Sequence, residues 1–205
     1  MLNNNVIIKK VIVMDLMEKM EKYAKENYVP IARKPNIEYL KELIKKEELF
    51  EVLELGSAIG YSSINMALVD SRVNIVTIER DKKMYTEAVK NIKEANLEKQ
   101  IKIIFDDIFN VELGEKKFDL IFIDAAKAQY RKFFEKFSPL LKDKGVIISD
   151  NVELLDLQRL TDSKKSKKLL EKMKFYREFL ANLEDYESEF LSIGDGFAIT
   201  RKKFN

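Results

Sequence analysis

Short apolar runs alternate with runs of helical spacing from residue 50 onward. The apolar runs cover residues 50–55, 73–79, 101–105, 118–124 and 145–150. Segments with apolar residues at helical intervals lie between most of them, at 61–69, 82–96 and 129–141, and another follows at 167–183. Strands that are apolar on both faces and separated by helices favour a parallel sheet covered by helices on both sides. The sequence therefore predicts an α/β chain with a mostly parallel, doubly wound sheet.

The C-terminal residues depart from this alternation. Residues 186–193 and 197–203 have the pattern of strands, and the turn Gly194-Asp195-Gly196 separates them. Two strands joined by such a short glycine-containing turn predict an antiparallel hairpin. This hairpin brings the expected number of strands to seven and closes the sheet.

The N-terminal residues are expected to be helical. Residues 11–28 place apolar side chains at helical intervals, and a second helix is predicted over 36–48, with Asn36 after Pro35 as its N-cap. No low-complexity block divides the chain. We therefore expect a single domain over residues 1–205, in which residues 1–48 form N-terminal helices and a cap.

The absence of cysteine and histidine removes whole classes of chemistry. Without cysteine there are no disulfides, thiolate nucleophiles or sulfur-ligated metals. Without histidine, the usual general base, the Ser-His-Asp triad and the commonest zinc ligand are missing. Acid–base or metal chemistry must therefore use Asp, Glu, Lys, Tyr, Asn or Arg. The net charge of +2 permits a nucleic-acid partner without requiring one.

Neither a membrane span nor a secretory signal is visible in the sequence. All apolar runs are shorter than the roughly 18 residues that a span needs. The first 13 residues lack the order of charged, apolar and small-residue regions that a signal peptide has. We expect a cytoplasmic protein that has no membrane partner.

A glycine turn follows the first predicted strand. Gly56 and Gly60 lie where a doubly wound sheet brings its backbone close to a ligand. Tyr61 stands where a Walker loop needs lysine, which argues against a triphosphate. Glu79 ends the next strand, 19 residues after Gly60, at the position of an acid that accepts hydrogen bonds from ribose hydroxyls.

The acid before the glycine turn narrows the ligand further. Glu54 lies two residues before Gly56, where its carboxylate would repel a pyrophosphate and attract an ammonium group. The combination fits S-adenosylmethionine, which has a ribose and an α-amino group but no phosphate. The alternative is a glycine turn that serves only helix packing and is flanked by two surface acids.

Oxygen-bearing side chains follow two of the later strands. Asp124 ends the fourth predicted strand, and Asp150 and Asn151 end the fifth. The carboxyl ends of parallel strands open onto one edge, so these three side chains can converge there. Carboxylate and amide oxygens select a hard cation, with Mg²⁺ as the first choice and Mn²⁺ or Ca²⁺ as alternatives. Each Asp taken alone could equally be a helix cap or a turn former.

Lys127 lies three residues after Asp124 and can face the same edge. An ammonium group beside a divalent cation is disfavoured in its charged form, so Lys127 could act as a general base toward an acceptor hydroxyl. The alternative is an ordinary Asp–Lys pair at i,i+3, worth a few tenths of a kcal/mol.

Four segments resemble one enzyme family. They are VLELGSAIGYSS (52–63), IERD (78–81), FDLIFIDAAKAQY (118–130) and GVIISDNV (145–152). They are similar to the cation-dependent class I O-methyltransferases, the catechol and caffeoyl-CoA group. DAAKAQYRKFFEKFSPLL (124–141) and FLSIGDGFAITRKK (190–203) resemble most the bacterial branch that methylates 5-hydroxyuridine at the tRNA wobble position. The resemblance extends from about residue 30 to the last strand and implies a Rossmann-like class I methyltransferase fold.

The resemblance also implies roles for individual residues. It makes Asp124, Asp150 and Asn151 the metal ligands and Lys127 the catalytic base. It implies that the following residues hold the methyl donor: Ala32, Glu54, Gly56, Ser62, Glu79, Asp106 and Asp124. Three places depart from the family pattern. Ala58 stands where relatives often carry a third glycine, and Asn36 where they often carry an acid. After the third strand two acids follow one another where a glycine commonly precedes the acid, so the choice of Asp106 over Asp107 rests on the alignment with the family pattern.

The expected acceptor is a tRNA anticodon loop whose 5-hydroxyuridine offers an enol oxygen beside a carbonyl. Cations that could neutralise its phosphates are Arg33, Lys34, Arg131, Lys164, Lys165, Lys167 and Lys168, although such clusters are often only solvated surface. Tyr28, Tyr61 and Tyr130 could stack on a base or pack in the core. The segment 152–168 is shorter than the loop that usually covers the acceptor in this family.

Three other functions compete with this interpretation. A methyltransferase of catechols or phenols would use the same catalytic residues. A nicotinamide oxidoreductase would need a GxGxxG loop, which the sequence GSAIGYS does not match. A nucleoside-binding protein without catalysis would give no reason for Lys127 beside Asp124. The resemblance further implies a homodimer formed through the N-terminal helices.

Overall fold

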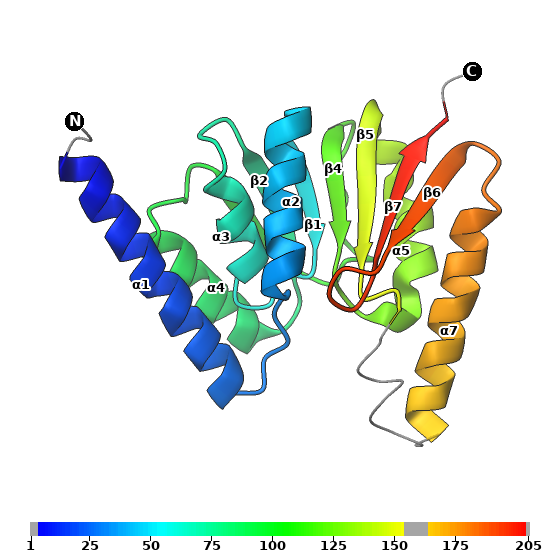
Figure 1. The fold of residues 1–205 in the computed structure, drawn as a ribbon, viewed down its shortest axis with the longest axis horizontal. Helices are drawn as coiled ribbons and strands as arrows, with labels where there is room; N and C mark the ends of the chain where they lie inside the picture. The colour runs from blue at the N-terminus through cyan, green and yellow to red at the C-terminus, as the bar shows by residue number, and fades with distance from the viewer. Residues whose placement is uncertain (1–3, 154–163, 204–205) are drawn as a thin grey trace.

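The chain forms one seven-stranded sheet with helices on both faces (Figure 1). The computed structural model describes residues 4–153 and 164–203. The strands, in chain order, are β1 (Glu51–Leu55), β2 (Asn74–Glu79), β3 (Ile101–Phe105), β4 (Phe118–Ile123), β5 (Leu141–Asp150), β6 (Tyr186–Leu191) and β7 (Phe197–Lys202). Their spatial order is β3-β2-β1-β4-β5-β7-β6. Strands β1 to β5 pair in parallel, and β7 pairs antiparallel with both β5 and β6. The predicted α/β fold with a C-terminal antiparallel hairpin is confirmed.

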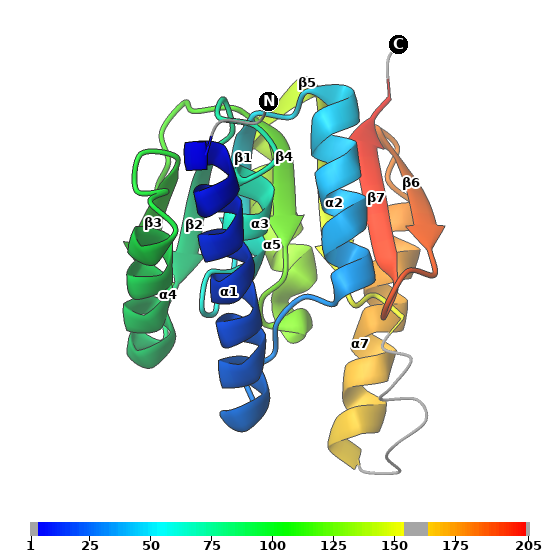
Figure 2. The ribbon, with the colours of Figure 1, turned by 60° about the vertical axis from the view of Figure 1, so that its left-hand side comes forward.

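Two helical layers cover the sheet (Figure 2). One face carries α1 (Asn4–Glu26), α2 (Lys34–Glu47), α3 (Tyr61–Ala67) and α4 (Lys82–Glu94); the other carries α5 (Tyr130–Phe137) and α7 (Lys164–Ala181). Two short 3-10 turns, Lys127–Gln129 and Ser138–Leu140, flank α5. Each layer buries its own apolar cluster against the sheet, because strand residues alternate between the two faces.

The strand register brings the carboxyl ends of four parallel strands level with one another. Leu55 of β1 pairs with Ile78 of β2 and with Ile123 of β4. Ile123 in turn pairs with Ser149 of β5. The residues that follow these positions therefore lie along one edge: Gly56, Glu79, Asp124 and Asp150. The strand order reverses at β1, because β2 and β3 follow on one side of it and β4 and β5 on the other. Doubly wound sheets bind ligands at such a reversal.

The prediction that Asn36 caps the second helix is wrong. Arg33 occupies the N-cap position with extended backbone angles, and α2 begins at Lys34 with Pro35 in its first turn. Proline fits the first turn of a helix because its missing N–H would have no partner there. Asn36 therefore lies inside the helix, and its side chain is buried. The first helix also begins earlier than expected, at Asn4 rather than residue 11.

No helix among the described residues is both long enough and apolar enough to span a membrane.

Candidate active site at the carboxyl edge of the sheet

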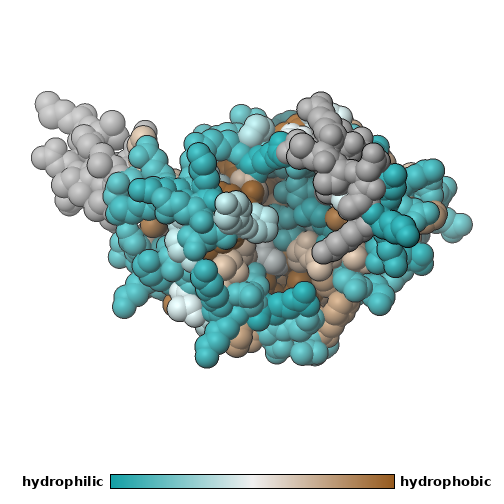
Figure 3. Space-filling model, turned by 90° about the horizontal axis from the view of Figure 1, so that it is seen from below, coloured by the Kyte–Doolittle hydropathy of each residue, from teal (hydrophilic) through white to brown (hydrophobic). Residues whose placement is uncertain are grey.

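A cavity of about 410 Å³ opens at the carboxyl edge of the parallel strands. Seen from this edge, the molecular surface is hollowed near its centre, with apolar groups inside the hollow (Figure 3). Most of the residues predicted to form the site line this cavity: Ala32, Gly56, Ser62, Glu79, Asp124, Lys127, Asp150 and Asn151. Glu54 and Asp106 do not line it. The structure thus brings together residues from five separate segments of the chain.

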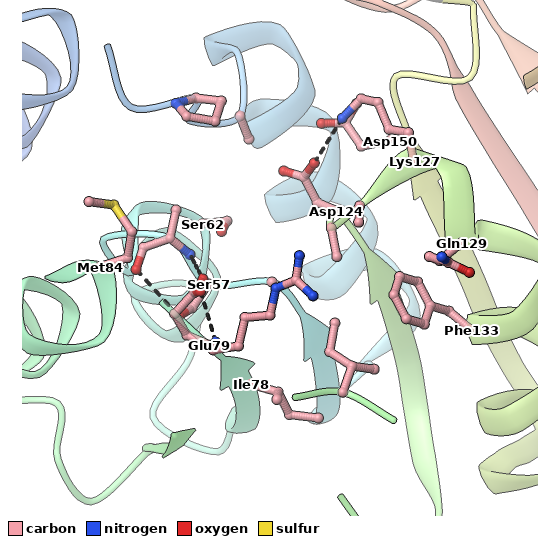
Figure 4. A pocket seen from close by; sticks show the side chains of 18 of the residues that line it. Ser57, Ser62, Ile78, Glu79, Met84, Asp124, Lys127, Gln129, Phe133 and Asp150 are labelled. Carbon is pink, nitrogen blue, oxygen red and sulfur yellow. Dashed lines mark hydrogen bonds and ion pairs between the residues drawn. The ribbon is translucent and has the colours of Figure 1, made fainter. Parts of the chain in front are cut away.

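The cavity has two sides with different chemistry (Figure 4). Ser57, Ser62, Glu79 and Met84 lie on one side, which we call the glycine-loop side. Asp124, Lys127 and Asp150 lie on the other, which we call the Lys127 side.

Gly56 lets the two sides meet through their backbones. Its φ is +96°, and a Cβ there would lie 2.4 Å from the carbonyl oxygen of Asp124. The backbone N–H of Asp124 donates to the carbonyl of Leu55 over 3.0 Å. Any side chain at position 56 would push these two strand ends apart, so glycine is required for this close approach.

Glu79 is fixed against the glycine loop by three backbone donors. Its carboxylate accepts hydrogen bonds from the N–H groups of Ala58, Arg80 and Asp81 over 2.9, 2.8 and 2.7 Å. Ala58 has a φ of +44°, in the left-handed region that glycine occupies more readily. The backbone of this loop thus keeps the conformation of a glycine-rich turn although the residue is alanine.

Glu54 supports the loop from behind instead of facing the cavity. It is fully buried, and the hydroxyls of Ser62, Ser63 and Thr77 donate hydrogen bonds to its carboxylate. Burial raises the pKa of Glu54 to about 7, and the three hydroxyl hydrogen bonds oppose that rise. Its partner Ser62 lines the cavity and Glu54 does not, so a direct contact of Glu54 with the methyl donor stays a prediction.

Asp106 also lies outside the cavity, and its neighbour Asp107 lines it instead. Asp106 accepts hydrogen bonds from the backbone N–H of Asp107 and from the Asn110 amide, which makes it part of the local turn. Asp107 forms an ion pair of 3.1 Å with Arg80, which also lines the cavity. The resemblance favoured Asp106 of these two acids, and its contact with the methyl donor stays a prediction.

The Lys127 side gathers the buried carboxylate of Asp150, the part-buried carboxylate of Asp124 and the amine of Lys127. Lys127 Nζ lies 3.7 Å from Asp124 Oδ1. Burial raises the pKa of Asp124, and the charge of Lys127 opposes this. Burial and then the charge of Asp124 raise the pKa of Asp150 to about 7. The negative charge of Asp124 thus disfavours the ionised form of Asp150, and a nearby positive charge would favour it.

Several other residues were predicted to contact an acceptor, and their surroundings in the structure differ. Arg33, Lys34 and Arg131 form ion pairs with Asp195, Glu21 and Glu135. Tyr61 lines the cavity and donates to Glu21, Tyr28 is 93% exposed and Tyr130 is buried in the core. Residues 154–163 lie outside the described part of the chain, as does the side chain of Lys165.

Sequence reasoning missed the apolar lining of the cavity. Ile78, Met84, Ile108, Phe109 and Phe133 all line it, and the rings of Phe109 and Phe133 lie 5.0 Å apart. Ile78 directly precedes Glu79, so its position was inferable; the other four come from helices and turns whose orientation the pattern did not reveal.

Nearly the whole chain matches one protein family. A family model described as O-methyltransferase matches residues 7–203. The chain belongs to the O-methyltransferase family. This confirms the predicted membership of the catechol and caffeoyl-CoA group of methyltransferases, and with it the predicted class of enzyme. The assignment to the tRNA branch stays a prediction.

Individual relatives agree with this membership. A crystal structure from Staphylococcus aureus, described as a candidate caffeoyl-CoA O-methyltransferase, is 34% identical with a TM-score of 0.85 and covers 96% of this methyltransferase and 100% of that chain. The catechol O-methyltransferase of Niastella koreensis is 37% identical over 107 residues, which are 49% of this chain and 48% of that protein. An O-methyltransferase of tomaymycin synthesis from Streptomyces achromogenes, solved in complex with SAM, shares the fold at 22% identity and a TM-score of 0.79, covering 92% and 90% of the two chains.

Proposed function

We propose that this methyltransferase transfers the methyl group of S-adenosylmethionine to an acceptor oxygen with the help of a divalent cation. The observation that carries the proposal is the convergence in one cavity of the glycine loop with Glu79 and, opposite them, Asp124, Lys127 and Asp150. One side has the groups that suit a nucleoside, and the other has those that suit a hard cation and a base. Methyl transfer needs such a pair of sites, since the acceptor oxygen must be aligned with the sulfonium.

The glycine-loop side suits the donor. Glu79 is held by backbone N–H groups and lines the cavity, where its carboxylate can accept hydrogen bonds from ribose hydroxyls. Met84, Ile108 and Phe109 provide an apolar wall for an adenine. Gly56, Ser62 and Ala32 would surround the methionine part. The relative from Streptomyces achromogenes, solved with SAM, has the same fold.

The Lys127 side suits a cation of the Mg²⁺ class. No three His, Cys, Asp or Glu side chains gather as a metal site within residues 4–153 and 164–203. The candidate set consists instead of two carboxylates and the amide of Asn151, three oxygen donors that would leave room for water and an acceptor. The raised pKa values of Asp124 and Asp150 fit this role, because a divalent cation would supply the missing positive charge. When bound, the cation would acidify and orient the acceptor hydroxyl.

Lys127 is the residue proposed to take the proton. Its ammonium group is paired with Asp124 in the described structure and lines the same cavity. Asp124 cannot serve Lys127 and a cation equally, so ligation by Asp124 would weaken the ion pair and favour neutral Lys127. A neutral amine in this position can accept the proton of an acceptor hydroxyl.

The proposed acceptor is 5-hydroxyuridine in a tRNA anticodon loop, with a catechol as the alternative. A second groove, of about 1190 Å³, starts at Val152 and Glu153, directly after Asn151, and continues along α7. Five cations line it, against three carboxylates: Lys164, Lys167, Lys168, Lys174 and Arg177. This excess of positive charge beside the candidate metal ligands supports an acceptor that carries phosphates.

A homodimer through the N-terminal helices completes the proposal. A further groove lies between α1, α2 and the end of α3, and Met14 and Leu68 in its lining are exposed. A second copy of the chain would cover this apolar surface. Light scattering that finds a monomer at micromolar concentration would contradict the dimer without affecting the proposed chemistry.

The proposal is tested by transfer of a labelled methyl group to total tRNA from cells that lack this protein. We expect label at a hydroxyuridine nucleoside with Mg²⁺ present, and its loss with EDTA or in Lys127→Ala. Turnover of a catechol without labelling of tRNA would keep the mechanism and change the acceptor. Labelling that EDTA leaves unchanged would contradict the role of the cation.

A further inference from the structure

We propose that Asn36 and Asp195 are positioning residues that determine which oxygen atoms of Asp150 and Asn151 face the cation. This inference rests on the proposed function, because it concerns the same candidate metal ligands. It is carried by contacts between three segments that are far apart in sequence: the first turn of α2, the end of β5 and the turn between β6 and β7. Figure 1 shows that the β6–β7 turn lies beside the start of α2.

Asn36 holds one oxygen of Asp150. Its Nδ2 donates to Asp150 Oδ1 over 2.7 Å, and both side chains are buried. The backbone N–H of Asn151 donates to the same Oδ1, also over 2.7 Å. Both donors end on one oxygen, so Oδ2 of Asp150 is the atom that remains for a cation. The hydrogen bonds thus select one lone-pair direction of a carboxylate that could otherwise rotate.

Asp195 holds the amide of Asn151. Asn151 Nδ2 faces Asp195 Oδ2 at 3.5 Å, and Arg33 Nη2 pairs with the same Oδ2 at 2.9 Å. An amide can bind a cation only through its oxygen, because its nitrogen has no free lone pair. An acceptor that attracts Nδ2 therefore leaves Oδ1 of Asn151 for the cation. Backbone bonds from Val152 and Glu153 to the carbonyls of Gly196 and Asp195 keep the two segments together.

Both positioning residues leave a polar atom without a partner. Within the described chain, Oδ1 of Asn36 and Oδ1 of Asp195 are buried and accept no hydrogen bond. Buried unpaired acceptors reduce stability, so the fold itself gains little from these polar side chains. Their placement is explained instead by the groups that they orient.

Gly194 makes room for this arrangement. Its φ is +59°, and a Cβ at this position would lie 2.0 Å from Asn36 Oδ1. A side chain there would displace the Asn36 amide from Asp150. Gly194→Ala is therefore a way to disturb the Asn36 contact without changing Asn36 itself.

The test is a titration with Mn²⁺, followed by the paramagnetic resonance signal of the free ion, at saturating S-adenosylmethionine. We expect Asn36→Ala and Gly194→Ala to weaken Mn²⁺ binding by about 10- to 100-fold, the usual loss when a group that orients a metal ligand is removed. The affinity for S-adenosylmethionine should not change. Asn65→Ala is the matched control: Asn65 is also a buried helical asparagine, but its Nδ2 donates to Tyr61 O in its own helix.

The outcomes separate this inference from the proposed function. Wild-type protein that binds no Mn²⁺ would overturn the proposed function and this inference together. Wild-type binding that survives unchanged in both variants would overturn the inference alone. Should Asn36→Ala not fold, the near-isosteric variant Asp195→Asn provides the test. A carboxylate at position 195 attracts only the amide nitrogen of Asn151, whereas an uncharged amide can face either its nitrogen or its oxygen. Unaltered Mn²⁺ affinity in that variant would contradict the role of Asp195.

Discussion

Glu54 and Asp150 are both buried carboxyl groups on parallel strands, and burial raises the pKa of each to about 7, yet their oxygens have different partners. The hydroxyls of Ser62, Ser63 and Thr77 bond both oxygens of Glu54. The donors to Asp150 end on Oδ1 alone. A carboxylate whose two oxygens both accept hydrogen bonds from the protein supports the fold. A carboxylate that accepts them on one oxygen has its second oxygen left to bind a ligand. Burial and a shifted pKa do not distinguish these two roles; the partners of each oxygen do.

The largest expected effect is on catalysis at the Lys127 side. Lys127→Ala should lower kcat by about 10²- to 10⁴-fold, the usual contribution of a general base. Its affinity for S-adenosylmethionine should stay the same, because the donor is expected to bind to the opposite side. Single-turnover rates together with calorimetric donor binding measure both quantities. A joint fall of rate and donor affinity would show that the two sides are not independent.

Stability should respond to Glu54 and not to Asp150. Glu54→Ala leaves three buried hydroxyls without their acceptor and should lower the free energy of unfolding by about 1–3 kcal/mol. Asp150→Asn keeps an acceptor for Asn36 and removes a buried charge, so stability in the absence of cations should not fall. Urea unfolding of the two variants in EDTA tests the contrast. Equal destabilisation would mean that Asp150 also has a structural role.

The comparison of wild type with Glu54→Gln should isolate the contribution of Glu54 to the pH dependence of stability. Its pKa is about 7 in the folded protein against 4.5 in the unfolded chain, so the folded state binds the Glu54 proton more tightly. The free energy of unfolding should therefore fall as the pH rises from 4.5 to 7, by up to about 3 kcal/mol from this group. Glu54→Gln has no proton to lose and should have a flatter profile over this range. If urea titrations gave wild type and Glu54→Gln parallel profiles of unfolding free energy against pH, the raised pKa of Glu54 would be refuted.

The smallest expected effect concerns the backbone of the glycine loop. Ala58→Gly should raise the free energy of unfolding by about 0.5–1 kcal/mol, because relief of a left-handed alanine slightly exceeds the entropy cost of glycine. Gly60→Ala is the matched reverse change: its φ is +83°, and the nearest atom to an added Cβ lies 3.4 Å away, so its cost is mainly conformational. Thermal unfolding should show a change in the free energy of unfolding that has opposite signs in the two variants. Changes of the same sign would show that packing, and not backbone conformation, determines the effect.

The sequence pattern predicted the strands and the set Asp124, Lys127, Asp150 and Asn151 correctly as neighbours. Buried parallel strands have a recognisable composition, and their carboxyl ends must share one edge. The pattern failed where a side chain's direction depends on another element. The hydroxyls that donate hydrogen bonds to Glu54 belong to α3 and β2. Asp150, the partner of Asn36, lies 114 residues away in the sequence. Neither contact leaves a local signal in the sequence.

The close approach of Gly56 to Asp124 has a consequence for how this protein can change. The spacing between the glycine-loop side and the Lys127 side is determined by two main-chain segments in contact, with no side chain between them. Substitutions at the start of α2 or in the β6–β7 turn would instead change the contacts of Asp150 and Asn151, and they would leave this main-chain contact in place. The candidate metal ligands can thus be reoriented while the distance between the two strand ends stays the same.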